Sequence, residues 1–144
     1  IMNLKLFLNK KIPTIVGLDH ISYRINPIDR WFNFYFEAKE RGLDPLWTIN
    51  HGWISGIYYK DPDGNLVEIF FEHFSSAEEF KSNISPDFED EPIGTNMDVE
   101  VLYEMYKAGS DFSELITKGN TVPEGKKPVS GFDAVVNMKK KFKD

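Results

Sequence analysis

The sequence contains no cysteine among its 144 residues, so no disulfide takes part in its fold. A chain of this length is large enough to bury a hydrophobic core without disulfides or structural metals, and one domain is the first expectation. Because no thiol is present, thiol chemistry leaves the compartment undetermined. The cytoplasm is then the default location.

Long apolar runs and basic clusters are also missing. No apolar stretch reaches the roughly 20 residues that a membrane helix needs, and the apolar residues of 1–12 are interrupted by lysines and lack a small-residue cleavage site. The formal net charge is -6, and no segment combines clustered Lys and Arg with interleaved aromatic residues as phosphate-binding surfaces do. We therefore expect neither a membrane nor a nucleic acid as partner.

Aromatic residues are abundant, at 15%, and most of them lie between Phe7 and Phe88, where we expect the core. Residues 17–26 predict a strand with period-two alternation. One face of that strand is apolar and carries Ile21, Tyr23 and Ile25. The other face carries His20, Ser22 and Arg24.

A helix should follow, because Asn26, Pro27 and Asp29 are typical of a helix start. Trp31, Phe34, Tyr35 and Ala38 then recur at the spacing of a single helical stripe, and Gly42 ends the helix. The stripe is predicted to pack on a sheet face made by six residues: Ile21, Tyr23, Ile25, Val67, Ile69 and Phe71.

Three further strands are predicted at residues 46–50, 53–60 and 65–72, with a tight turn at 61–64 between the last two. The resulting order is β, α, β, β, β, and the sequence contains no repeat of this unit. After residue 74 the character changes. We expect an acidic connector at 86–92, an amphipathic helix at 99–107 and a Pro-, Gly- and Lys-rich loop at 120–131.

His20 and Glu68 are the candidate metal ligands that the pattern offers. A divalent ion needs lone pairs from neutral imidazole or ionised carboxylate, held on rigid elements. Both residues lie opposite the apolar face of their strand, so both can point to the concave side of a curved sheet. The alternative is that His20 is a satisfied polar residue and Glu68 a solvated one.

Residues 17–24 and 51–71 together resemble one βαβββ module of the vicinal-oxygen-chelate superfamily, which includes glyoxalases, bleomycin-resistance proteins and extradiol dioxygenases. The strongest likeness is to type I ring-cleaving enzymes related to biphenyl-2,3-diol 1,2-dioxygenase. It extends through Pro92, Ile93 and Gly94 into residues 102–115, and covers the chain from Gly17 to about Pro123. The resemblance implies an α+β fold with the module at residues 17–74 and a helical and irregular extension at 75–144.

The resemblance also implies an activity: Fe(II)-dependent cleavage of a catechol-type small aromatic diol with O2, with Mn, Ni or Zn as alternative metals. His20 matches the second metal-binding histidine of the family and Glu68 its glutamate. Tyr58 matches a pocket tyrosine that hydrogen-bonds substrate, although a half-buried strand tyrosine is the alternative.

Three further residues are candidates on position alone. His51, on a turn beside the last hairpin, suits proton transfer, with a structural turn histidine as the alternative. Ser22 and Phe70 lie on the same faces as the two ligands, two residues along, so they can line a substrate pocket. Plain packing on the sheet surface is the alternative for both.

Family members build their metal site from two modules, and residues 1–16 are too short for more than the remnant of a preceding one. The region after His73 contains no histidine, so the two-histidine, one-glutamate set is not expected within one chain. Three explanations compete: a truncated natural product of reduced activity, a fragment, or pairing of two chains.

A homodimer would bring together two copies of His20 and Glu68, a set that resembles the isomerase glyoxalase I. A non-enzymatic ligand-binding cleft of the bleomycin-resistance kind is the remaining alternative.

Overall fold

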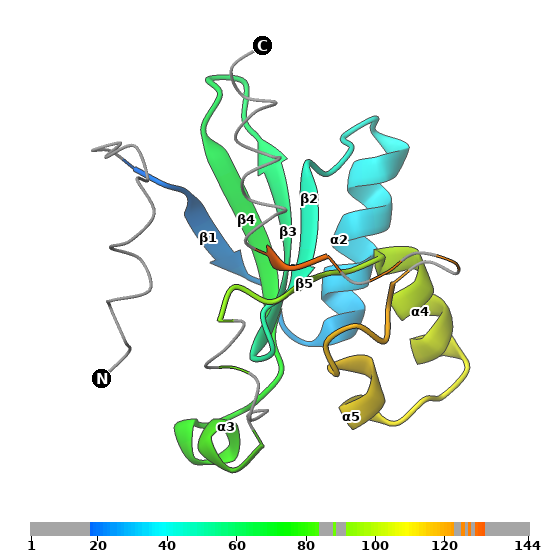
Figure 1. The fold of residues 1–144 in the computed structure, drawn as a ribbon. Coiled ribbons are helices and arrows are strands. Elements are labelled where there is room, and N and C mark those ends of the chain that lie inside the picture. The colour runs from blue at the N-terminus through cyan, green and yellow to red at the C-terminus, as the bar shows by residue number, and fades with distance from the viewer. Residues whose placement is uncertain are drawn as a thin grey trace.

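The computed structural model describes residues 18–83, 88, 92–122, 125, 127 and 129–131. They form a mixed five-stranded sheet in the order β1-β4-β3-β2-β5, with helices beside it (Figure 1). The strands are β1 (Ile21–Arg24), β2 (Trp47–Asn50), β3 (Ile54–Lys60), β4 (Leu66–Glu72) and β5 (Thr95–Asn96). The helices are α2 (Ile28–Glu40), α3 (Ala77–Asn83), α4 (Val99–Lys107) and α5 (Phe112–Leu115). The α+β class is confirmed.

The order β, α, β, β, β over residues 21–72 is the predicted one. β1 runs parallel to β4 and places Ser22 opposite Glu68, whereas β3 runs antiparallel to β4 and places Tyr58 opposite Glu68. The tight turn between β3 and β4 closes with a 3.0 Å hydrogen bond from Gly64 N to Asp61 O. Parallel pairing of β1 and antiparallel pairing of β3 thus bring two strands to the two sides of Glu68.

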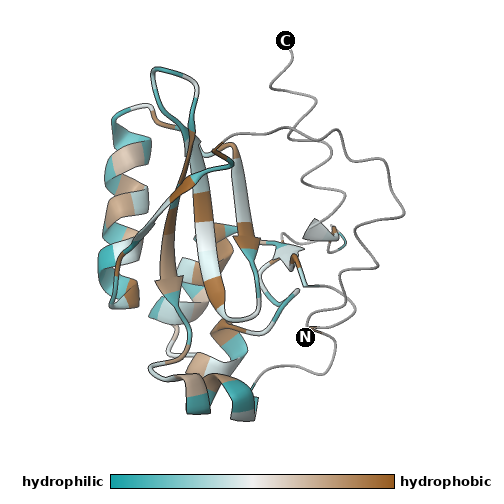
Figure 2. Cartoon of the chain, turned by 90° about the vertical axis from the view of Figure 1, so that its left-hand side faces the viewer, coloured by the Kyte–Doolittle hydropathy of each residue, from teal (hydrophilic) through white to brown (hydrophobic). Residues whose placement is uncertain are grey.

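The aromatic core lies on one side of the sheet, where α2, α4 and α5 are found (Figure 1). Trp31 of α2 is fully buried, donates from Nε1 to Ile69 O at 3.0 Å and packs edge-on against Phe71 at 4.9 Å. Both helices and strands mix hydrophilic and hydrophobic residues (Figure 2), as expected of elements with one buried side. The helical stripe therefore faces the sheet, as predicted.

The predicted packing misses one residue and is wrong for two others. Phe32, which was left out of the stripe, is 1% exposed because α4 covers it through Tyr103 and Tyr106, with ring centroids 5.0 and 5.3 Å away. Ile21 and Tyr23 were expected in the core but are 39% and 56% exposed. They lie on the correct face, but on the edge strand β1.

The part after residue 74 contains more regular structure than expected. α4 matches its predicted bounds and is capped by Asp98, whose side chain accepts from Glu100 N and Val101 N. α3, α5 and β5 were not predicted, and β5 adds to the sheet by pairing with β2. Residues 1–17 and most of the predicted 86–92 connector lie outside the described residues. In the described part, no helix is long and apolar enough to span a membrane.

His73, which was not assigned to a site, follows β4 and is 4% exposed. Its Nε2 lies 2.9 Å from Ser55 Oγ, and its ring packs against Phe71 at 5.2 Å. Burial, with a smaller contribution from His51, lowers the pKa of His73 to about 3. The folded state therefore holds this ring neutral.

Acidification should destabilise the protein through His73. The unfolded ring titrates near pH 6.5, so this contribution is present above that pH and is lost as pH falls towards 3. Between pH 7 and pH 5 the loss should be about 2 kcal/mol in the free energy of unfolding. Urea denaturation of the wild type and of His73→Gln at both pH values measures the part of this loss that is due to His73. Equal losses of stability in the two proteins would show that His73 does not cause the pH dependence.

Candidate functional site

Glu68 of β4 lies on the face of the sheet opposite the aromatic core and is 3% exposed. Ser22 Oγ donates to its Oε2 at 2.6 Å, and His20 Nε2 lies 3.4 Å from the same oxygen. His51 Nε2 lies 3.6 Å from Oε1. One buried carboxylate is thus surrounded by three residues: His20 before β1, Ser22 in β1 and His51 in the turn after β2.

Gly56 makes room for this carboxylate. A Cβ at Gly56 would lie 2.4 Å from Glu68 Oε1, closer than real contacts allow. The backbone of Gly56 lies outside the positive-φ region, so the reason for glycine here is space rather than conformation. Sequence inspection missed this role, although a glycine inside a strand is the signal of a close approach.

Both site histidines are oriented by oxygen atoms at their Nδ1. His20 Nδ1 lies 2.8 Å from Asp19 Oδ2, and His51 Nδ1 lies 2.5 Å from Ile93 O. Carbonyl and carboxylate oxygens accept hydrogen bonds, so in the neutral rings each Nδ1 carries the hydrogen. Both Nε2 lone pairs are consequently directed to the neighbourhood of the Glu68 oxygens.

Glu68 is ionised in this setting. Burial raises the pKa of its carboxyl, but contacts with His51 and Ser22 outweigh burial and hold that pKa below its ordinary value. Oε1 is buried and has no hydrogen-bond partner within the described part of the chain. A buried negative oxygen without a donor is an environment that a cation would stabilise.

Tyr58 contributes a neutral phenol. Burial, followed by the charge of Glu68, raises the pKa of Tyr58 far above its ordinary value. Its hydroxyl lies 3.4 Å from His51 Nε2, to which it can donate, and its ring stacks on Trp47 at 5.0 Å. The ring of His20 meets Tyr58 edge-on at 5.4 Å. Tyr58 is therefore held between both histidines.

The structure brings together five of the six residues selected from sequence. They are His20, Ser22, His51, Tyr58 and Glu68. The sixth, Phe70, is half-buried on the same face, opposite Gly56 in the β3–β4 register. Asp19, Trp47 and Ile93 were missed, and the β2–β3 pairing that places Trp47 opposite Tyr58 is a property of the structure that the sequence does not show. The roles assigned to all six stay predictions.

His20 and Glu68 fit two positions around a divalent ion. Ligand atoms that are each about 2.1 Å from one ion lie about 3 to 3.4 Å apart, and the His20 Nε2 to Glu68 Oε2 separation is 3.4 Å. Within residues 18–83, 88, 92–122 and the few described beyond them, no group of three or more His, Asp or Glu is arranged to hold a metal. The described residues thus fit part of a metal site.

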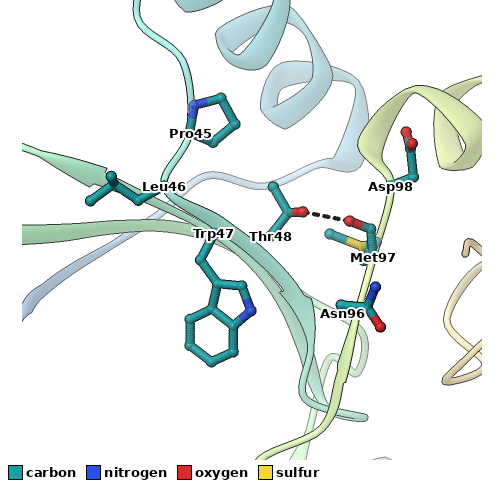
Figure 3. Close-up of a pocket in the computed structure, with 7 residues that line it drawn as sticks. All are labelled: Pro45, Leu46, Trp47, Thr48, Asn96, Met97 and Asp98. Carbon is teal, nitrogen blue, oxygen red and sulfur yellow. Dashed lines mark hydrogen bonds between the residues drawn. The ribbon is translucent and has the colours of Figure 1, made fainter. Parts of the chain in front are cut away.

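A separate hollow of about 310 Å³ lies at the edge of the sheet between β2 and the segment after β5. Figure 3 shows Thr48 directed to Met97, whose carbonyl accepts its hydrogen bond, and Trp47 projecting from the other side of β2. None of the six predicted site residues lines this hollow. Trp47, which stacks on Tyr58, nevertheless lines it and connects it to the surroundings of Glu68.

Comparison with known proteins finds two relatives from Rhodococcus globerulus. Over 112 residues, 77% of this chain, the sequence is 31% identical to biphenyl-2,3-diol 1,2-dioxygenase 3. Over 111 residues it is 28% identical to biphenyl-2,3-diol 1,2-dioxygenase 2. The chain is homologous to these dioxygenases. It spans 59% and 58% of their lengths, and neither a family model nor a solved structure matches.

Gly56→Ala should destabilise the protein because its methyl group collides with the Glu68 side chain. Overpacking of this kind costs about 1 to 3 kcal/mol in the free energy of unfolding. In a Glu68→Ala background most of that cost should disappear. Urea denaturation of the wild type, both single variants and the double variant measures the coupling. The same cost in both backgrounds would mean that Gly56 is needed for another reason.

Proposed function

We propose that this chain carries the metal-binding module of a type I extradiol ring-cleavage dioxygenase. Its substrate would be a small aromatic diol of the catechol type, cleaved with O2, and its metal Fe(II) or another divalent ion such as Mn, Ni or Zn. The observation that carries the proposal is the buried Glu68 carboxylate, which has one histidine Nε2 near each of its oxygens. His20 Nε2 lies 3.4 Å from Oε2, and His51 Nε2 lies 3.6 Å from Oε1, the oxygen without a hydrogen-bond partner in the described part of the chain. Homology to two biphenyl-2,3-diol 1,2-dioxygenases supports it.

His20 and Glu68 would hold the metal. An imidazole nitrogen and a carboxylate are the ligand types of the two-histidine, one-carboxylate sites of non-haem iron oxygenases. The bound ion would supply open positions for the two oxygens of the diol and for O2. Asp19 at His20 Nδ1 would fix the ring that presents Nε2, as outer partners of metal-binding histidines do.

The remaining residues would handle the substrate. His51 presents an Nε2 lone pair that can accept a proton from a diol hydroxyl, and neutral Tyr58 can donate a hydrogen bond to a substrate oxygen. Ser22 holds Glu68 Oε2, which leaves Oε1 for other contacts. Phe70 and the Trp47–Tyr58 stack would provide apolar surface for an aromatic ring.

A third protein ligand would have to come from elsewhere than the described residues. A second copy of the chain in a homodimer, or another module, would supply it. β1 is the place where either would join, because it ends the sheet and all four of its residues are exposed. Without such a contribution, ring cleavage is expected to be weak.

Metal binding can be tested directly. Calorimetric titration of the chain with Co(II), and with Fe(II) under anaerobic conditions, should show metal binding. We expect His20→Ala and Glu68→Gln to lower the metal affinity by more than about tenfold, because loss of a residue that only orients a ligand already lowers it about 10- to 100-fold. Glu72→Gln is the matched control, because Glu72 lies four residues along on the same face of β4 and pairs with Arg24. Equal metal affinity in all four proteins would show that His20 and Glu68 are not metal ligands.

Ring cleavage is tested on the same samples. The chain alone, loaded anaerobically with Fe(II) and then given 2,3-dihydroxybiphenyl and air, should form little or no yellow ring-opened product, because two protein ligands hold the ion weakly. Robust turnover that both His20→Ala and Glu68→Ala abolish would show that the third ligand is already present. Tight binding of the diol without metal and without turnover would instead favour the ligand-binding alternative.

A further inference from the structure

A turn from outside the βαβββ unit reaches the site. Ile93 and Gly94 lie 42 and 43 positions after His51 in the sequence, and Ile93 O is 2.5 Å from His51 Nδ1. The turn leads into β5, which pairs with β2 through Asn50 and Thr95. The carbonyl that orients His51 is therefore supplied by the C-terminal segment.

Gly94 is the residue that allows this approach. Its φ is +103°, a conformation that other residues rarely adopt. A Cβ at Gly94 would lie 2.1 Å from Asn50 O and 2.7 Å from His51 Cα, both backbone atoms of the strand end and turn that carry the histidine. Any side chain here would push the turn, and the Ile93 carbonyl with it, away from His51.

The turn is also held from its other side. Gly131 N donates to Gly94 O at 2.7 Å, and Thr95 forms an isolated bridge with Ser130. A Cβ at Gly131 would lie 2.4 Å from Ile93 Cγ2. Ile93 and Gly94 are thus enclosed between the end of β2 and residues 130–131.

We infer that Ile93 and Gly94 are positioning residues that fix the tautomer of His51. The Ile93 carbonyl only accepts, so it keeps the hydrogen of the neutral ring on Nδ1 and leaves the Nε2 lone pair 3.4 Å from Tyr58 Oη. The opposite tautomer would carry a hydrogen on Nε2, 3.6 Å from Glu68 Oε1, and would have no lone pair on Nε2 for a substrate proton. The use of that lone pair rests on the proposed function, whereas the tautomer does not.

The tautomer can be read by NMR on the metal-free protein with 15N-labelled histidines. The chain has three histidines, so His51→Gln identifies the signals of His51 by their loss. At a pH where the ring is neutral, Nδ1 should resonate as a protonated nitrogen and Nε2 as an unprotonated one. The Nδ1 proton should exchange slowly and show a nuclear Overhauser contact to the Ile93–Gly94 turn. A proton on Nε2, or no such contact, would overturn the inference.

Two variants test the role of the turn. Gly94→Ala should shift His51 towards a mixture of tautomers, with loss of the separate Nδ1 and Nε2 pattern. Gly109→Ala is the matched control, because Gly109 also has positive φ but nothing within 4 Å of an added Cβ. Gly131→Ala displaces the turn from its other side and should shift the pattern in the same direction, even if Gly94→Ala does not fold.

Each outcome of these experiments has a different meaning for the role of the turn. A wild-type tautomer pattern in folded Gly94→Ala and Gly131→Ala would show that the turn does not position His51. The expected pattern together with absent metal binding would leave this inference standing and remove the proposed function. Loss of the pattern in Gly109→Ala as well would assign the effect to general backbone strain and overturn the specific role of Gly94.

Discussion

Burial of the Glu68 carboxylate is the constraint on which the rest of this face depends. An ionised carboxylate removed from water costs several kcal/mol unless it is paired or hydrogen-bonded. Here Ser22 satisfies one oxygen, and the other faces His51 without a donor in the described part of the chain. A fold that retains such a group sacrifices stability at this point, which is characteristic of sites selected for binding or chemistry.

The opposite face of the sheet supports this arrangement. Trp31 bonds to the backbone of β4 at Ile69, the position next to Glu68, and Phe71 packs against the same indole. Tyr35 and Lys39 of α2 both donate to Glu100, which ties α2 to α4 above the core. Rigid aromatic packing on the helix side thus fixes the strand that carries the carboxylate, and strand-based sites keep their geometry better than loop-based ones.

Period-two alternation predicted the faces of His20, Ser22 and Glu68 because side-chain direction in a strand is a local property. It could not predict how well each face is covered. Tyr23 lies on the helix side but is exposed on the edge strand, and Phe32 is buried only because α4 returns over it. Gly94 could not be connected to His51, since a contact across 43 positions depends on where the later chain packs. The resemblance suggested candidate residues, and the pairing register showed which of them lie together.

The two kinds of chemistry in the proposed site have different structural origins. The residues proposed for proton handling all lie in the described part of the chain, where His51 contacts both the Ile93 carbonyl and the Tyr58 hydroxyl. The ligand part is incomplete there, because only His20 and Glu68 have suitable spacing. β5 and its turn act on the first part through His51, while the exposed β1 edge borders the second. If an additional ligand arrives at β1, it reaches the metal side of Glu68 without disturbing the histidine that the C-terminal segment already holds.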